Sequence, residues 1–313
     1  MEGKIALFGS YLAGLFVKGE RIPVRAETVL GDEFREGPGG KGSNQAVAAA
    51  CFGADVSFIG RIGRDRRGDE ALAMYGRFGV RTANIVRDAV LPTGVSVIMV
   101  DRNGDNVIMS VPGASAAFSA ADVDVCADLL RTCDYVGFQC ENNPAVVAYG
   151  IRRAHESGAK VLLDPSPVCS LPDDLYPLVS IIKPNEVEAS ALSGIRVVDS
   201  ESAAAAGRWF LAKGVETAVI TLGERGVVRV GRDGARRLFV SRLPSPPVDS
   251  TGAGDVLAGA LLAHLAQDDG FDEALRFAVA ASALSVTSFG VVEAIPAVDA
   301  IRRILGDVRI CAE

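Results

Sequence analysis

A glycine-rich loop followed by one carboxylate stands directly before the most apolar helical run of the chain. Residues 245–266 read SPPVDSTGAGDVLAGALLAHLA, in which Gly252, Ala253 and Gly254 precede Asp255. Backbone N–H groups at a helix start can cradle an anion, and the helix dipole reinforces the cradle. Asp255 on the first turn could then accept a hydroxyl proton while the N–H groups hold charge on a transferred phosphoryl group. In the alternative interpretation, Asp255 only stabilises the helix N-terminus.

Two further glycine-rich stretches differ from the known phosphate-binding loops. EGPGGKGSNQ (36–45) is not a Walker motif, because Gly42 follows Lys41 where Ser or Thr should stand and Arg35 occupies the first glycine position. FGSYLAG follows the first apolar run, but Tyr11 occupies the second glycine of the dinucleotide fingerprint. The glycines of 36–45 still open a helix. They predict a ligand near that helix start, with ordinary turn chemistry as the alternative.

The elements that must position these residues alternate along the chain. Short apolar runs of strand length lie at 4–9, 56–60, 134–140, 160–164, 179–184 and 217–223. Helical patterns lie between and around them, at 43–53, 66–79, 119–131, 144–157, 186–193 and 200–213. Apolar strands without alternation, separated by helices, predict an α/β fold with a mostly parallel sheet between two helical layers. Such sheets bind ligands beyond the carboxyl ends of their strands.

The alternation of strands and helices is interrupted at residues 11–36 and 82–112, where the sequence predicts a β-ribbon. GVSVIMVDRNGDNVIMSV (94–111) predicts a hairpin that turns at Asn103-Gly104-Asp105. We therefore predict a core of 1–10, 37–81 and 113–313, with 11–36 and 82–112 forming a small β-sheet lid; an extra edge hairpin on the core is the alternative. An apolar lid face would support a homodimer, with contacts from Val95, Val97, Ile98, Val107, Ile108 and Met109.

Composition narrows the class of protein. The 313 residues carry a formal charge of −7, which argues against a nucleic-acid or anionic-membrane surface. The apolar runs at 5–17 and 277–292 are interrupted or too short for a signal peptide or a membrane span. The six cysteines form no C-x-x-C pair, and we expect them to be reduced in a cytoplasmic protein. With only two histidines, acid–base chemistry falls to carboxylates.

Four stretches in order, GGKGSNQA, PNEVE, TLGERG and DSTGAGD, resemble the PfkB/ribokinase family of carbohydrate kinases. The resemblance runs over residues 4–306, and the combination is specific although each stretch alone is weak. It implies a ribokinase-like α/β/α core with a β-sheet lid. It also implies an ATP- and Mg²⁺-dependent kinase that phosphorylates a hydroxymethyl group of a small sugar. A nucleoside kinase of the same family and a catalytically silent sugar-binding regulatory protein are the alternatives.

The resemblance also assigns roles to matching residues. Asp255 becomes the catalytic base, and the N–H groups of Gly252, Ala253, Gly254 and Asp255 become the anion hole. Asn185 and Glu188 match the pair that organises Mg²⁺, through water. The nucleotide side is matched by Thr221, Leu222, Gly223, Glu224, Arg225, Gly226 and Val279, with Asn185. The sugar side is matched by Gly40, Lys41, Gly42, Ser43, Asn44 and Glu141.

Two features of this chain depart from the resemblance. A K⁺ ion beside the anion hole would match Asp249, Thr251, Ser285, Ser288, Gly290 and Ala294. Ala294 lacks the hydroxyl that ribokinases tend to have there, which weakens the match. In GSYLAGL, Leu12 and Gly14 stand where ribokinases carry an amide and a carboxylate for sugar hydroxyls. A site without these partners loses discrimination for those hydroxyls, so phosphorylation of ribose itself is in doubt, and Gly14 is expected to leave extra volume.

Overall fold

The computed structural model describes residues 3–103 and 105–313. Its large sheet has ten strands. In spatial order they are β14 (Val308–Ala312), β13 (Gly234–Val240), β12 (Val227–Gly231), β11 (Thr217–Thr221), β10 (Ile181–Ile182), β9 (Lys160–Asp164), β8 (Tyr135–Gln139), β1 (Lys4–Phe8), β4 (Asp55–Gly63) and β5 (Ile85–Asp88). Seven neighbouring strands run parallel to one another: β11, β10, β9, β8, β1, β4 and β5. Strands β12, β13 and β14 add an antiparallel edge beside β11.

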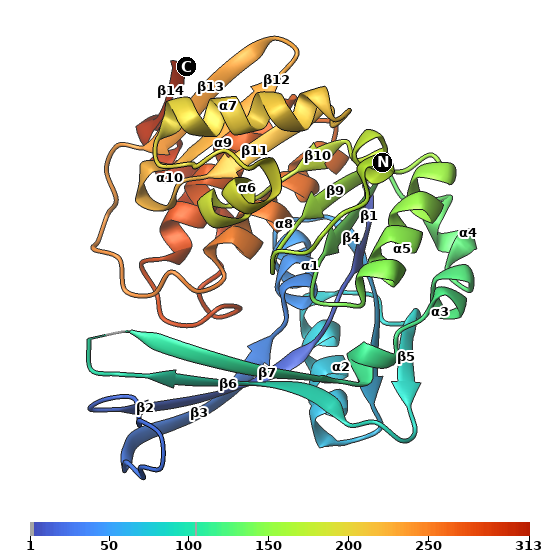
Figure 1. Ribbon diagram of the computed structural model, residues 1–313, viewed down its shortest axis with the longest axis vertical. Coiled ribbons are helices and arrows are strands. Elements are labelled where there is room, and N and C mark those ends of the chain that lie inside the picture. The colour runs from blue at the N-terminus through green and yellow to red at the C-terminus, as the bar shows by residue number, and fades with distance from the viewer. Residues whose placement is uncertain (1–2, 104) are drawn as a thin grey trace.

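Helices cover both faces of this sheet (Figure 1). One layer contains α1 (Lys41–Cys51), α2 (Arg66–Phe78), α8 (Ala253–Ala266), α9 (Phe271–Ser285) and α10 (Val298–Ile304). The other contains α3 (Ala120–Asp124), α4 (Ala127–Leu130), α5 (Pro144–Glu156), α6 (Glu186–Ser193) and α7 (Ser200–Ala212). Within β1, Ile5 and Leu7 pack in the first layer, and Ala6 and Phe8 pack in the second. Burial on both faces explains the unalternated strands, and the predicted three-layer fold is confirmed.

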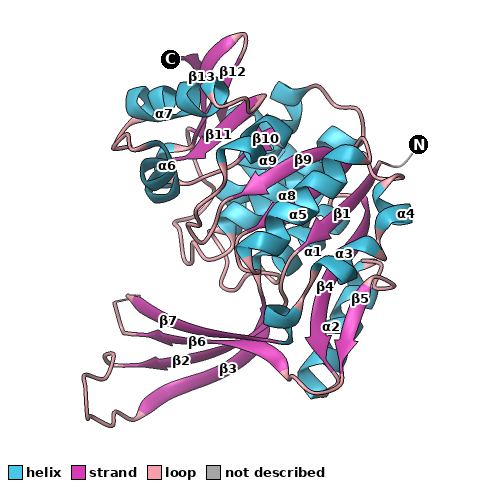
Figure 2. Ribbon diagram, turned by 45° about the vertical axis from the view of Figure 1, so that its right-hand side comes forward, coloured by secondary structure: helices cyan, strands magenta, loops and turns pink. Residues whose placement is uncertain are grey.

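The small sheet projects from the core as a separate blade (Figures 1 and 2). Its strand order is β3 (Gly31–Gly39), β2 (Leu12–Gly19), β6 (Thr93–Val100) and β7 (Asn106–Gly113). Strands β6 and β7 pair antiparallel with Ser96 opposite Ser110, as the hairpin prediction requires; Gly104 of the predicted turn lies outside the described residues. The range 82–112 is too wide for this sheet, because β5 pairs with β4 in the large sheet.

The cysteines differ from the expectation that all six are reduced. Cys140 and Cys169 form a disulfide, with their Cα atoms 6.2 Å apart. The two residues follow β8 and β9, and these neighbouring parallel strands bring their carboxyl ends together. The two cysteines are 29 residues apart along the chain, and no sequence motif indicated that they pair.

No helix within the described residues has the length and apolarity needed to cross a bilayer.

Candidate active site

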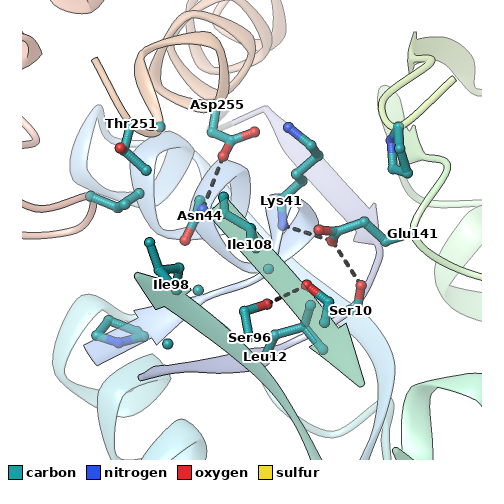
Figure 3. A pocket seen from close by; sticks show the side chains of 18 of the residues that line it. Ser10, Leu12, Lys41, Asn44, Ser96, Ile98, Ile108, Glu141, Thr251 and Asp255 are labelled. Atoms are coloured by element: carbon teal, nitrogen blue, oxygen red, sulfur yellow. Dashed lines mark hydrogen bonds between the residues drawn. The ribbon is translucent and has the colours of Figure 1, made fainter. Parts of the chain in front are cut away.

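A cavity of about 560 Å³ lies between the small sheet and the carboxyl ends of the core strands (Figure 3). The small sheet contributes Leu12, Gly14, Phe16, Ser96, Ile98, Ile108 and Ser110. The core contributes Ser10, Gly40, Lys41, Asn44, Glu141, Thr251, Gly252 and Asp255. Most of the residues assigned to the sugar side therefore meet in one place, although Gly42 and Ser43 lie buried inside the start of α1 rather than in the cavity wall.

Asp255 lies on the first turn of α8 at the inner end of this cavity. The side chain is buried and accepts hydrogen bonds from Nδ2 of Asn44 at 2.9 Å and Nε2 of Gln45 at 3.1 Å. Two amides from α1 thus fix the carboxylate across more than 200 residues of sequence. A helix-start role alone would not require these partners.

The loop before Asp255 is shaped for close approach. Gly252 has φ of 77°, and a Cβ atom there would lie 2.4 Å from the Val291 side chain, so only glycine fits. The N–H groups of Ala253 and Asp255 donate to the carbonyls of Ser250 and Gly252 within the turn. Within the described residues, the backbone N–H groups of Gly252 and Gly254 have no such acceptor. Two backbone N–H groups of the described loop are therefore free to bind an anion, whereas the sequence predicted four.

Glu141 follows β8 and binds two other residues of the cavity wall. Its Oε2 accepts from Ser10 Oγ and from the Lys41 backbone N–H, each at 2.8 Å. Burial raises the pKa of Glu141 to about 7. Burial alone would lower the pKa of Lys41, but the nearby carboxylates, Asp255 foremost, raise it above its usual range. The Lys41 side chain points toward the wall that carries Asp255 (Figure 3).

A second cavity, of about 410 Å³, lies on the other side of the α8 start. It is lined by Thr221, Gly223, Glu224, Gly226 and Val279 from the nucleotide-side prediction, together with Ala253 and Gly254. Leu222 is buried beneath this loop instead, and the Arg225 guanidinium pairs with Glu186 and the Val198 carbonyl. These two side chains do not line the second cavity.

The two cavities meet at the start of α8. Gly252 and Asp255 line the first, and Ala253 and Gly254 line the second. A group held in one cavity can therefore be transferred to an acceptor in the other across the glycine loop.

Asn185 and Glu188 form a reciprocal cap at the start of α6. Glu188 N–H donates to Asn185 Oδ1 at 2.9 Å, and Asn185 N–H donates to Glu188 Oε2 at 2.8 Å. This cap uses Oε2 and gives Oε1 of Glu188 no hydrogen bond within the described residues. In residues 3–103 and 105–313, no group of three or more His, Cys, Asp or Glu side chains is placed to hold a metal ion.

The residues matched to a K⁺ site are partly brought together. Asp249 accepts from the backbone N–H of Thr251 at 2.9 Å and of Gly290 at 3.2 Å, which ties two loops beside the cradle. Ser285 Oγ donates to the Ser282 carbonyl, and Ala294 is a buried methyl group. The K⁺ site stays a prediction.

Sequence reasoning missed four polar residues beneath the cradle. Gln45 Nε2 also donates to Asp164 Oδ2 at 2.9 Å, and Gln139 Nε2 donates to Gln45 Oε1 at 2.6 Å. Lys183 Nζ lies 3.0 Å from Asp164 Oδ2. Gln139, Asp164 and Lys183 stand at the ends of adjacent strands β8, β9 and β10. The sequence signal that could have identified three of them is a polar residue directly at the end of an apolar strand.

Comparison with known proteins places this geometry in context. The family model described as pfkB family carbohydrate kinase matches residues 3–298. Ribokinase of Haemophilus influenzae is 36% identical over 296 residues, which cover 95% of this chain and 96% of that protein. Deoxyribokinase of Salmonella typhi is 30% identical over 296 residues, covering 94% and 96%. The structure of Arabidopsis thaliana ribokinase complexed with ribose and ATP has a TM-score of 0.90 at 27% identity, covering 97% and 99%.

Proposed function

Since the chain belongs to the pfkB family of carbohydrate kinases, we propose that it transfers the γ-phosphoryl group of ATP to a hydroxymethyl group of a small sugar. Family membership makes it a phosphotransferase with an alcohol acceptor, which sets aside the silent regulatory alternative. The observation that carries the proposal is the position of Asp255, fixed by two amides where the two cavities meet. The Arabidopsis relative, solved with ribose and ATP, supports the choice of nucleotide.

In this mechanism, Asp255 accepts the proton of the sugar hydroxyl as its oxygen attacks phosphorus. The N–H groups of Gly252 and Gly254 hold charge on the transferred phosphoryl oxygens, aided by the α8 dipole. Asn185 and Glu188 would hold Mg²⁺ through water, using the Glu188 oxygen that the cap leaves open. When bound, Mg²⁺ neutralises charge on the phosphate chain. The amides of Asn44 and Gln45 keep the base oriented.

The sugar cavity differs from the expectation at Gly14. A Cβ atom on Gly14 would lie 2.8 Å from Cε2 of Phe16, so the Phe16 ring occupies the volume that the missing side chain was expected to free. The expectation of extra space at Gly14 was therefore wrong. Residues two apart on a strand share a face, which explains how Phe16 reaches this position.

The cavity wall formed by the small sheet is consequently apolar at Leu12, Phe16, Ile98 and Ile108. Its polar groups are the hydroxyls of Ser96 and Ser110, which are 2.7 Å apart. This wall favours a sugar with fewer hydroxyl groups on the side away from the phosphorylated carbon. We infer a deoxy sugar, and the match to a deoxyribokinase supports this choice. A nucleoside remains the alternative acceptor, because Leu12 could also face a base.

A coupled ADP-release assay tests the acceptor. We expect a higher kcat/KM for 2-deoxy-D-ribose than for D-ribose in a panel that includes ketohexoses, sugar acids, polyols and nucleosides. Phosphorylation of nucleosides alone would overturn the sugar assignment, and a preference for D-ribose would overturn the deoxy-sugar assignment.

We also propose a homodimer through the small sheet. Because side chains alternate along a strand, Ile98 and Ile108 point into the cavity, which corrects their assignment to the dimer contact. The opposite face carries Val95 and Val97, and it exposes Val17, Phe34, Val107, Met109 and Val111. Val95 packs against the core, and the exposed apolar residues of this face fit a second copy related by a two-fold axis.

A further inference from the structure

A lysine is buried directly behind the glycine loop. Lys183 follows β10, and its side chain is only 5% exposed. A Cβ atom placed on Gly254 would lie 3.2 Å from Nζ of Lys183, so the ammonium group lies beside the second glycine of the cradle. Lysine is seldom fully buried unless a charged partner is present.

The partner within the described residues is Asp164, at 3.0 Å from Nζ, and it does not satisfy the lysine completely. Asp164 is 1% exposed; its Oδ2 is shared with Gln45, and its Oδ1 has no hydrogen-bond partner. An ammonium group has three N–H donors, and this arrangement leaves donors for another acceptor. A buried ion pair is also weak evidence for stability, because desolvation of both ions offsets their attraction. The pair therefore needs a reason beyond packing.

We propose that Lys183 is a catalytic residue that binds the oxygens of the phosphoryl group in transfer. The inference rests on the proposed kinase function. The bond between the γ-phosphorus and the bridging oxygen breaks, a bond from the sugar oxygen to phosphorus forms, and the hydroxyl proton passes to Asp255. ADP leaves with the bridging electron pair. Lys183 stays protonated throughout and neutralises charge on the phosphoryl oxygens.

The buried network fixes this cation relative to the base. Asp164 binds Lys183 through Oδ2, and Gln45 donates to Asp164 and Asp255 from the same nitrogen. The backbone N–H of Lys183 donates to the Leu163 carbonyl at 2.8 Å, which continues the parallel pairing of β9 and β10. Asp164 and Gln45 are thus positioning residues that link the cation and the base in one buried network.

The first variant is Lys183→Met, which keeps the length of the side chain and removes its charge. We expect kcat to fall roughly 10²–10³-fold, as for loss of one preorganised donor to a transition state. We also expect the affinity for Mg·ATP, measured by calorimetry without sugar, to fall roughly 10- to 100-fold, the effect of one lost charged hydrogen bond. The affinity for Mg·ADP should change much less, because ADP lacks the γ-phosphate.

Two further proteins make the test decisive. Lys183→Met/Asp164→Asn also removes the carboxylate that the single variant leaves buried without a cation, and it should fold where the single variant does not. Lys213→Met is the matched control, since Lys213 pairs with Asp173 on the surface far from the cradle. A folded double variant with near-normal kcat and an unchanged ratio of ATP to ADP affinity would show that Lys183 is structural. Because the binding arm needs no acceptor, inactivity of the wild type toward every sugar would refute the proposed function and leave this test intact.

Discussion

Replacement of Glu141 by glutamine should stabilise the protein at alkaline pH and impair catalysis. Burial raises the pKa of Glu141 from 4.5 to about 7, although Ser10 and the Lys41 backbone donate hydrogen bonds to the carboxylate. The folded state therefore binds this proton more tightly than the unfolded state. Between pH 4.5 and 7 the free energy of unfolding consequently decreases as pH rises, and the full penalty is present above pH 7.

The size of the effect follows from the shift. A rise from 4.5 to about 7 corresponds to about 3 kcal/mol. Glu141 lines an open cavity, so water reduces the penalty to roughly 1–3 kcal/mol. Glu141→Gln removes the ionisation and keeps an oxygen for the same two donors. The variant should match the wild type near pH 4.5 and exceed its free energy of unfolding by that amount at pH 8.

Urea unfolding followed by circular dichroism at several pH values between 4.5 and 8 measures this difference. Activity should change in the opposite direction if, as proposed, the ionised carboxylate binds sugar hydroxyls. Wild-type kcat/KM should then rise through an apparent pKa near 7, and the variant should lose that rise. Glu216→Gln, on the surface, is the control and should change neither profile. A stability gain that is constant with pH, or larger at low pH, would refute the reasoning.

Three other substitutions test the remaining assignments. Asp255→Asn should reduce turnover roughly 10²–10⁴-fold, the range for a lost general base, while calorimetry shows ATP affinity within a few-fold of normal; near-normal turnover would remove its catalytic role. Leu12→Asn/Gly14→Asp/Phe16→Ala restores the polar pair and clears the ring that would clash with it. It should improve kcat/KM for D-ribose, since each charged or buried hydrogen bond contributes about 1–3 kcal/mol, and no gain would show that this stretch does not face the sugar. Met109→Glu should yield a monomer by light scattering, and a wild type that is already monomeric at micromolar concentration would remove the proposed dimer.

The fold could be predicted where local pattern and burial agree. Residues 5–8 of β1 are all apolar because both faces of the strand are buried there, and this property is visible in the sequence. The antiparallel edge of β12, β13 and β14 was not predicted. The hairpin of β12 and β13 around Arg232 and Asp233 is a local signal that was overlooked, whereas the pairing of β14 with β13 depends on tertiary contacts that no local pattern encodes. β10 is only two residues long, and Pro184, which has no backbone N–H to donate to a neighbouring strand, follows shortly after it.

The site could be predicted only in part. The glycine loop and Asp255 are adjacent in sequence, so their chemistry could be inferred together. Gln45, Asp164 and Lys183 are far apart along the chain, and only the neighbouring ends of β9 and β10 and the start of α1 bring them together. The prediction also failed for residues close in sequence. The missing side chain of Gly14 suggested open space, but the Phe16 ring, two residues away, fills it.

Charge balance explains why cations must lie inside this site. Four carboxylates surround the start of α8 and the sugar cavity, against two ammonium groups: Asp255, Asp164, Glu141 and Glu188, with Lys41 and Lys183. In the proposed mechanism a carboxylate acts as the base, yet its negative charge repels the phosphate chain that approaches it. The raised pKa of Glu141 relieves part of this conflict near neutral pH. In the proposed mechanism the helix dipole, Mg²⁺ and the two lysines offset the remaining negative charge, and Lys183 does so from beside Gly254 within the core.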